Sequence, residues 1–580
     1  MLCGIPASPG LGMGRVFILD EPEIKIDTTP VDESQVEKEL LLLKQAHAKS
    51  VEQLEAICRT ACENIGEEEG KIIRAQVLVL QDPTLLSEME EKISKGLSNA
   101  AYAANQVFNE KIVLFESIDD EYLRERANDI SDAAKRLVKN ILGIPIKDIG
   151  EIRDEAVLVG REVTPSQIVS LNKKYIKGII AETGGPTSHT AIIARNLEIP
   201  AVLGARGITS ALKDSQLAAV NGSKGIIILP SSGDEEESLR ELIQKHSLIK
   251  EEMRQLTGLP AETSDGHRVE IAANIGLSGE AGTALDNGAE GIGLFRTEFL
   301  YMDRKSMPDE QEQYKAYREA VEAMNGKPVI IRTLDIGGDK EIPYFKFPVE
   351  SNPFLGWRAI RICLDMKEMF ATQLRAILRA SAFGKVRIMY PMISSVEEVL
   401  EANAFLEGVK ESLRMENIGF DNEIEVGVMI EIPSAAIAAD LIIKNVDFFS
   451  IGTNDLTQYT LAVDRGNEKV SSYYRGFHPS VLRLIKNVID VSHRAGKFTG
   501  MCGELAGNPL ATVMLLGMGL DEFSMSPASM RKIKKIVRSV DFEFAKRVAD
   551  SVIGLSTAKE VEDYMNKILS DLKLDYLLEV

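Results

Sequence analysis

Two kinds of hydrophobic pattern divide the first half of the chain. From Glu33 to Ile141, apolar residues recur at the spacing of amphipathic helices. The segments on either side, residues 1–32 and 142–230, hold short apolar runs typical of strands, at 15–19, 156–159, 178–181, 201–203, 218–220 and 226–229. The pattern predicts a small α/β domain made of residues 1–32 and 142–230, with a helical bundle, residues 33–141, inserted in it.

The second half alternates apolar runs with helical segments. A polar, acidic stretch, residues 231–260, predicts a helical linker. Beyond it, residues 261–580 contain strand-like runs at 269–273, 291–295, 329–332, 386–390, 426–430, 448–451, 498–501 and 522–525. Strands that alternate with helices in this way predict a (β/α)8 TIM barrel, whose chemistry belongs at the C-terminal ends of its strands.

Charge and composition exclude several classes of protein. The 580 residues carry a formal net charge of -21, which argues against nucleic acid or an anionic membrane as a partner. No apolar run approaches the roughly 18 residues of a membrane span, and the N-terminus lacks the pattern of a signal peptide. The five cysteines are scattered and odd in number, which indicates reduced thiols. We therefore expect a cytoplasmic protein without membrane insertion.

Chemically useful residues follow the predicted strands of the barrel. Arginine presents a planar fork that matches phosphate and carboxylate, so four arginines are candidates to bind a doubly anionic ligand: Arg296, Arg332, Arg358 and Arg465. Glu431 and Asp455 would repel each other in a closed site unless a cation lay between them. Hard carboxylate ligands that leave room for water and a substrate phosphate favour Mg²⁺. Asn454 and Cys502 also follow predicted strands.

A single histidine stands in a second notable setting. His189 follows a Gly-Gly-Pro-Thr-Ser run, residues 184–188, and begins a predicted helix. A neutral imidazole at a helix N-terminus is a good acceptor for a phosphoryl group, because the helix dipole and the free N–H groups favour the resulting anion. No P-loop motif is present, and the glycines of residues 10–14 precede a strand, so neither pattern supports a nucleotide site.

These motifs together resemble a known family. The runs 184–191, 291–300, 352–358 and 447–465 are similar to those of enzyme I of the bacterial sugar phosphotransferase system, the phosphoenolpyruvate–protein phosphotransferases. The resemblance covers essentially the whole chain. It implies transfer of the phosphoryl group of phosphoenolpyruvate to His189 and then to a histidine of the phosphocarrier protein HPr, with release of pyruvate, as the first step of sugar uptake.

The resemblance also implies roles for individual residues. Phosphoenolpyruvate would be bound by Arg296, Arg332, Asn454 and Arg465, with Arg358 nearby. Glu431 and Asp455 would hold Mg²⁺, and Cys502 would protonate the enolate carbon to release pyruvate. The inserted bundle would dock HPr, the α/β domain would swing between barrel and carrier, and the barrel would join two chains in a homodimer.

Two departures and two alternatives accompany this interpretation. Ile168 stands where many relatives carry a second threonine near the active histidine, and Gly476 replaces a usual proline. One alternative is a dikinase-like phosphoenolpyruvate/pyruvate phosphotransferase without its ATP-binding domain. The other is a noncatalytic regulator that binds a phosphorylated metabolite, which would be expected to lose His189, Cys502 or a metal-binding acid.

Overall fold

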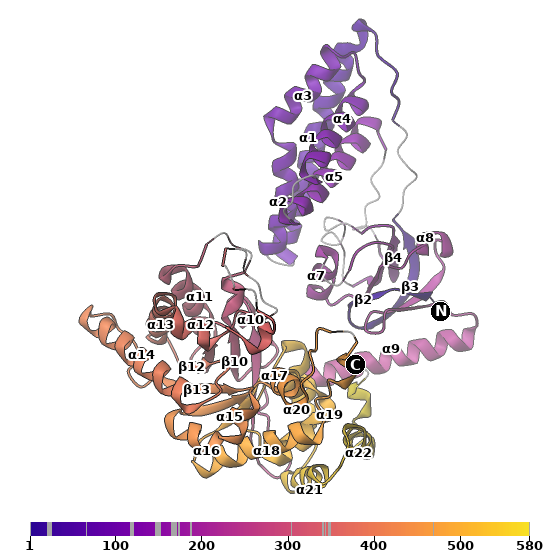
Figure 1. Ribbon diagram of the computed structural model, residues 1–580. Coiled ribbons are helices and arrows are strands. Elements are labelled where there is room, and N and C mark those ends of the chain that lie inside the picture. Colours follow the sequence, from indigo (N-terminus) through magenta and orange to yellow (C-terminus); the bar gives the residue numbers. More distant parts are fainter. Residues whose placement is uncertain are drawn as a thin grey trace. The chain divides into compact units, whose positions relative to one another are not determined.

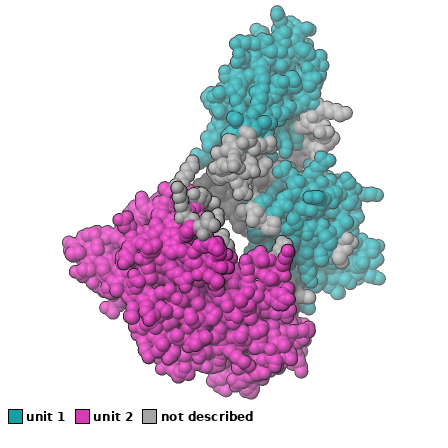
Figure 2. Space-filling view, viewed as in Figure 1, with its two compact units in different colours: residues 1–248, 580 teal, residues 249–579 magenta. Residues whose placement is uncertain are grey.

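The structure is a computed structural model of two compact units, residues 1–248 and residues 249–579 (Figure 2). It describes residues 2–578 apart from 20–25, 65–66, 117–120, 145–151, 164–166, 168–170, 172–173, 186–187, 303, 305, 339–341, 343, 346–347, 349 and 468. No helix in this described part is long and apolar enough to cross a membrane.

The first unit contains the expected helical bundle (Figure 1). A 3₁₀ turn, Glu33–Gln35, leads into α1 (Val36–Asn64), α2 (Glu67–Leu80), α3 (Pro83–Ser94), α4 (Ala100–Glu116) and α5 (Glu121–Leu142). Their apolar stripes meet in one core that includes Leu43, Leu54, Phe108 and Leu137, each at most 1% exposed. The stripes seen in the sequence therefore bury against one another, as amphipathic helices must.

Helix α3 is a short helix within the predicted bundle. Asp82 caps its N-terminus, where the side chain accepts a hydrogen bond from the Thr84 N–H at 2.8 Å, and Pro83 occupies the first turn. Leu85, Met89 and Ile93 are spaced four residues apart and are buried. The cap and this spacing are the two signals that define a short helix here.

The rest of the unit is an eight-stranded mixed sheet in the order β1-β8-β7-β3-β4-β5-β6-β2. Strands β3 to β6 run parallel, while β1, β2, β7 and β8 pair antiparallel. Separate apolar clusters, one around Leu158 and one around Val157, cover its two faces. The strands are Leu2–Cys3, Ile5–Ser8, Leu11–Ile18, Ala156–Gly160, Ile176–Ala181, Ala201–Leu203, Leu217–Asn221 and Ile226–Ile228, and the helices are α7 (His189–Asn196) and α8 (Ile208–Ala211).

Glycines allow β3 to pack closely against its neighbours. Gly12 and Gly14 lie within β3 rather than before it. A Cβ at Gly12 would lie 1.9 Å from the carbonyl oxygen of Lys177, and one at Gly14 would lie 2.8 Å from Glu155. The glycine-rich run of residues 10–14 thus allows backbone segments of the sheet to approach closely, and it does not form a nucleotide-binding loop.

Residues 233–255 form one continuous helix, α9 (Gly233–Gln255). In its first part, Leu239 and Ile243 pack against Met13 and Ala219 of the sheet. Near its end, Met253 is buried.

The second unit is a closed barrel of eight parallel strands, β9 to β16 (Figure 1). They are Glu270–Ile275, Gly291–Arg296, Val329–Arg332, Val386–Tyr390, Glu425–Ile430, Phe448–Ile451, Thr499–Met501 and Glu522–Met525. The helices are α10 (Glu280–Asp286), α11 (Glu310–Ala323), α12 (Ile360–Asp365), α13 (Lys367–Ser381), α14 (Val396–Met415), α15 (Pro433–Ile437), α16 (Ala439–Ile442), α17 (Thr453–Leu461), α18 (Pro479–Arg494), α19 (Pro509–Met518), α20 (Pro527–Arg538), α21 (Phe542–Ile553) and α22 (Ala558–Asp571). The predicted TIM barrel is confirmed.

Candidate active site

The barrel positions the predicted site residues at one end. Arg296 and Arg332 are the last residues of β10 and β11, and they are paired across the two strands. Glu431 follows β13 directly, and Cys502 follows β15. Because all barrel strands are parallel, the C-terminal ends of these strands meet at one mouth of the barrel.

Buried ion pairs link the arginines to two acids that the sequence analysis did not single out. Arg332 Nη2 lies 2.6 Å from Glu298 Oε1, and its Nη1 lies 3.1 Å from Asp335 Oδ2. Asp335 also pairs with Arg358, at 3.1 Å between Oδ1 and Nη2. Glu298 and Asp335 follow the strand-end arginines by two and three residues, and that position was the available signal. The two acids hold the guanidinium groups in fixed orientations.

Arg358 joins this network to the predicted metal-binding acids. Its side chain is 2% exposed, and its Nη1 lies 3.6 Å from Asp455 Oδ1. The same Nη1 donates to the Tyr459 hydroxyl at 3.1 Å. The Nε atoms of Arg332 and Arg358 are buried and have no hydrogen-bond partner among the described residues. Two donors at the mouth are therefore left unsatisfied, which is costly unless a ligand accepts from them.

Glu431 and Asp455 form a buried acidic pair. Burial, together with the charges of Asp455 and Asp335, raises the pKa of Glu431 to about 8. The charges of Arg332 and Arg358 act to lower it. Glu431 Oε1 accepts a hydrogen bond from the Met392 N–H at 2.6 Å. Asp455 Oδ1 is buried and accepts no hydrogen bond from the described residues. A cation between the two carboxylates would relieve their repulsion.

The number of side chains at the mouth that could bind a metal ion is small. Among the described residues, no group of three or more His, Cys, Asp or Glu side chains could hold a metal ion. Two carboxylates alone fit a hard cation that takes its other ligands from water and a substrate. The residues present are thus compatible with Mg²⁺ and incompatible with an all-protein metal cage.

Cys502 lies in the same electrostatic environment. It is 4% exposed, and its Sγ lies 3.9 Å from the Ile451 carbonyl oxygen. Burial is the main reason that the pKa of the Cys502 thiol is raised to about 11, although the charge of Arg332 acts to lower it. The thiol therefore keeps its proton at neutral pH, as a proton donor must.

Asn454 and Arg465 lie at the edge of this cluster. Asn454 is the second residue of α17, and its side chain exchanges hydrogen bonds with Glu504, whose N–H donates to Asn454 Oδ1 at 3.0 Å. Arg465 is half-buried, and its charge acts on the hydroxyl of Tyr474. Tyr474 in turn donates to the carbonyl oxygen of Asn454 at 3.2 Å. These contacts place Arg465 near the start of α17, which holds both Asn454 and Asp455.

His189 is the first residue of α7 in the other unit. Ser188 caps this helix, with its Oγ accepting from the Ala191 N–H at 3.3 Å and donating to the Gly185 carbonyl at 2.8 Å. Gly184 adopts a φ of 96°, a conformation that favours glycine. The backbone places His189 at a helix N-terminus, as predicted. Its imidazole is not among the side chains that the structure describes. Ile168 lies outside the described residues.

Comparison with known proteins assigns the class. Three family models match in order along the chain: the N-terminal part of phosphoenolpyruvate-utilising enzymes at residues 3–126, their mobile domain at 152–225 and their phosphoenolpyruvate-binding domain at 250–542. The last of these covers the barrel and every arginine and acid of the mouth described above. The chain has the domains of a phosphoenolpyruvate-utilising enzyme.

Full-length relatives narrow this assignment. A phosphoenolpyruvate-protein phosphotransferase of Haemophilus influenzae is 48% identical over 99% of this chain and 100% of its own. One of Geobacillus stearothermophilus is 46% identical over 98% of each chain. A solution structure of an Enzyme I protein covers 43% of this chain and all of its own, at 34% identity and a TM-score of 0.40. The chain belongs to the phosphoenolpyruvate-protein phosphotransferase family.

Proposed function

We propose that this enzyme transfers the phosphoryl group of phosphoenolpyruvate to His189 and from there to the histidine of HPr, as the first step of the sugar phosphotransferase system. The observation that carries the proposal is the barrel mouth, where two buried arginines, two buried carboxylates and a protonated thiol lie together. This combination suits a small phosphorylated acid better than any other ligand class, because it offers cationic forks, metal ligands and a proton donor.

The arginines and Asn454 bind and orient the substrate. Arg296, Arg332 and Arg465, with Arg358, neutralise the phosphate and carboxylate of phosphoenolpyruvate, and Asn454 donates a further hydrogen bond. Glu431 and Asp455 would hold Mg²⁺, which when bound supplies positive charge to the phosphoryl oxygens. The buried Nε donors of Arg332 and Arg358 support this assignment, since a bound anion would satisfy them.

The reaction consists of a substitution at phosphorus followed by protonation of a carbon atom. His189 Nε2 attacks phosphorus, the P–O bond to the enol oxygen breaks, and the phosphoryl group moves to the imidazole. The enolate left behind takes a proton at its terminal carbon from Cys502 Sγ, and pyruvate is released. Because the enol becomes a ketone, this protonation makes the forward reaction productive. The thiolate then recovers its proton from solvent.

Delivery of the phosphoryl group requires a second protein and a domain movement. The bundle, residues 33–141, is proposed to dock HPr, and the α/β domain to carry His189 as a rigid body between barrel and carrier. The segment 231–260 would connect the moving part to the barrel. The barrel, residues 261–580, is proposed to join two chains in a homodimer.

Labelling tests the proposal directly. Phosphoenolpyruvate labelled in its phosphoryl group, with Mg²⁺, is expected to load one acid-labile phosphoryl group per chain, and labelled ATP none. His189→Ala protein is expected to take up no label, while His246→Ala, a variant on α9, should label as the wild type does. Label on the His189→Ala protein, or label taken up from ATP, would overturn the assignment.

A further inference from the structure

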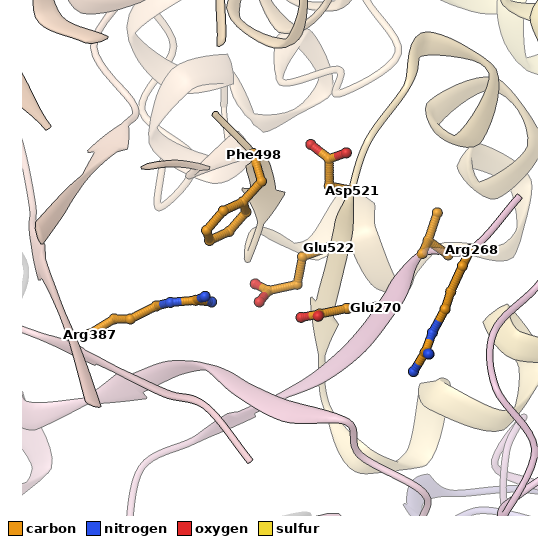
Figure 3. Close-up of a pocket in the computed structure, with 7 residues that line it drawn as sticks. Arg268, Glu270, Arg387, Phe498, Asp521 and Glu522 are labelled. Atoms are coloured by element: carbon orange, nitrogen blue, oxygen red, sulfur yellow. The ribbon is translucent and has the colours of Figure 1, made fainter. Parts of the chain in front are cut away.

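A cavity of about 440 Å³ lies at the other end of the barrel (Figure 3). Its walls come from the starts of the strands: Glu270 and Glu522 are the first residues of β9 and β16, and Arg387 is the second residue of β12. This is the end opposite the site proposed above, since the strands are parallel. Its polar and aromatic lining consists of Arg268, Glu270, Arg387, Phe498, Asp521 and Glu522.

The barrel makes room for the carboxyl group of Glu522. A Cβ on Gly293 of β10 would lie 2.5 Å from Glu522 Oε1, and a Cβ on Gly500 of β15 would lie 2.8 Å from it. Two glycines on different strands thus leave the space that the carboxyl group occupies. The residue is 2% exposed, and Oε1 is buried without a hydrogen-bond partner in the described part of the chain. An acceptor in this state is costly unless a donor reaches it.

The neighbouring charges do not satisfy Glu522. Asp521 is already engaged, with its Oδ2 accepting from the Thr499 N–H and lying 2.8 Å from His493 Nε2. Arg387 pairs through Nε with Glu425. Glu270 and Glu522 form no ion pair within 4.0 Å among the described residues. The cavity therefore contains two carboxyl groups without a close cationic partner.

Glu522 can still gain a charge near neutral pH. Burial, together with the charges of Glu270 and Asp521, raises the pKa of Glu522 to about 7, although the charge of Arg387 acts to lower it. A bound cation would favour the ionised form and offset the repulsion from Glu270. Binding of a positively charged ligand would therefore promote ionisation of this carboxyl group.

The lining favours an organic cation over a metal ion. The ring of Phe498 forms one wall, and the guanidinium group of Arg387 lies 4.7 Å from its centroid. A ring and a guanidinium group offer no oxygen ligands, and no set of three metal-ligating side chains exists here within the described residues. A volume of about 440 Å³ is in the range of small-molecule sites.

We propose that this cavity binds a small organic cation, an alkylammonium group whose N–H donors contact the carboxyl groups of Glu522 and Glu270. The site is separate from the phosphotransfer site and does not depend on the function proposed above.

Calorimetric titration of the full chain with 1,4-diaminobutane tests the proposal, with 1,4-butanediol as the uncharged counterpart. The diamine is expected to bind at pH 8 and the diol is not. Glu522→Gln, which keeps the shape and removes the charge, should weaken diamine binding at least tenfold. Glu423→Gln, an exposed glutamate outside the cavity, should leave it unchanged.

The wild-type protein supplies a second measurement that does not depend on the folding of a variant. With a pKa of about 7, Glu522 is roughly 90% ionised at pH 8 and roughly 10% at pH 6, so affinity should fall about tenfold between them. Equal binding of diamine and diol, equal binding to the Glu522→Gln protein, or no binding at all would overturn the proposal. Loss of thermal stability in Glu522→Gln without any diamine binding would show that the carboxyl group has a structural role only.

Discussion

Burial at the barrel mouth sets the protonation of the two residues on which the chemistry depends. Cys502 and Glu431 are at most 4% exposed, and burial is the main reason why the pKa of each is raised. For the thiol this keeps the proton that the proposed mechanism delivers to the enolate. For the carboxyl group it makes ionisation costly until a cation is present, so metal binding and deprotonation of Glu431 are coupled.

Replacing Cys502 with alanine should slow pyruvate formation by roughly 10²-fold or more, the usual contribution of a positioned general acid. Binding of phosphoenolpyruvate should stay within about twofold of wild type, because the thiol acts mainly in the transition state. Rapid-quench measurement of pyruvate and equilibrium binding of phosphoenolpyruvate separate the two effects. Cys363→Ala, which removes another buried thiol, is the control. A comparable loss of binding affinity in Cys502→Ala would assign Cys502 a positioning role instead.

Glu431 should make the stability of the metal-free barrel depend on pH. Its pKa is about 8 in the folded state against 4.5 in a free side chain, so between these values the folded state binds more protons. Stability from this group therefore falls as pH rises, by about 1.4 kcal/mol per pH unit inside that window. In EDTA, Glu431→Gln should gain about 2 kcal/mol relative to wild type from pH 6 to 7.5. Denaturant unfolding followed through Trp357, the single tryptophan, measures this, and parallel pH profiles for the two proteins would contradict it.

At the scale of elements, the sequence predicts best what is continuous and locally periodic. The barrel strands fall within two residues of their predicted limits, because most of them contain a short apolar run. Strands β1 and β2 were not predicted, since they have two and four residues and depend on pairing with β8 and β6 far along the chain. Pairing of this kind leaves no local pattern to detect.

The same contrast holds for the candidate site. Arg296, Arg332, Glu431 and Cys502 could be predicted because each stands at the end of a recognisable strand, where a barrel places its chemistry. Glu298 and Asp335 were missed although they follow strand ends by two and three residues, because their ion pairs with Arg332 arise only in the folded chain. Such partners are defined by three-dimensional proximity.

Substitution of Gly12 by alanine should destabilise the α/β domain. The new Cβ would lie 1.9 Å from the backbone oxygen of Lys177 in β5, which cannot move aside as a side chain can. We expect a loss of at least about 2 kcal/mol, and a melting temperature of this unit lower by roughly 4–8 °C in scanning calorimetry. Gly233→Ala is the matched control, because a Cβ there meets nothing within 4 Å. Equal melting temperatures for the two variants would contradict the packing argument.

At the scale of the whole molecule, the chemistry is divided between separate cores. The histidine belongs to the first unit and the proposed substrate site to the second. Within the first unit, the bundle has its own apolar core, and the sheet has two more. Parts with independent cores can move as rigid bodies, and a phosphoryl carrier that must visit two partners requires such movement.

This independence allows the two half-reactions to be separated. Strands β3 and β4, which flank the bundle in sequence, pair directly in the sheet from Arg15 with Ala156 to Ile18 with Val159. Replacing residues 33–141 by a flexible linker should therefore leave the sheet folded. The shortened protein is expected to exchange a carbon label between phosphoenolpyruvate and pyruvate through His189 but to transfer no phosphoryl group to HPr. Transfer to HPr at the wild-type rate would refute bundle docking, and loss of exchange in a protein whose α/β domain still melts cooperatively would show that the bundle is needed for the first step as well.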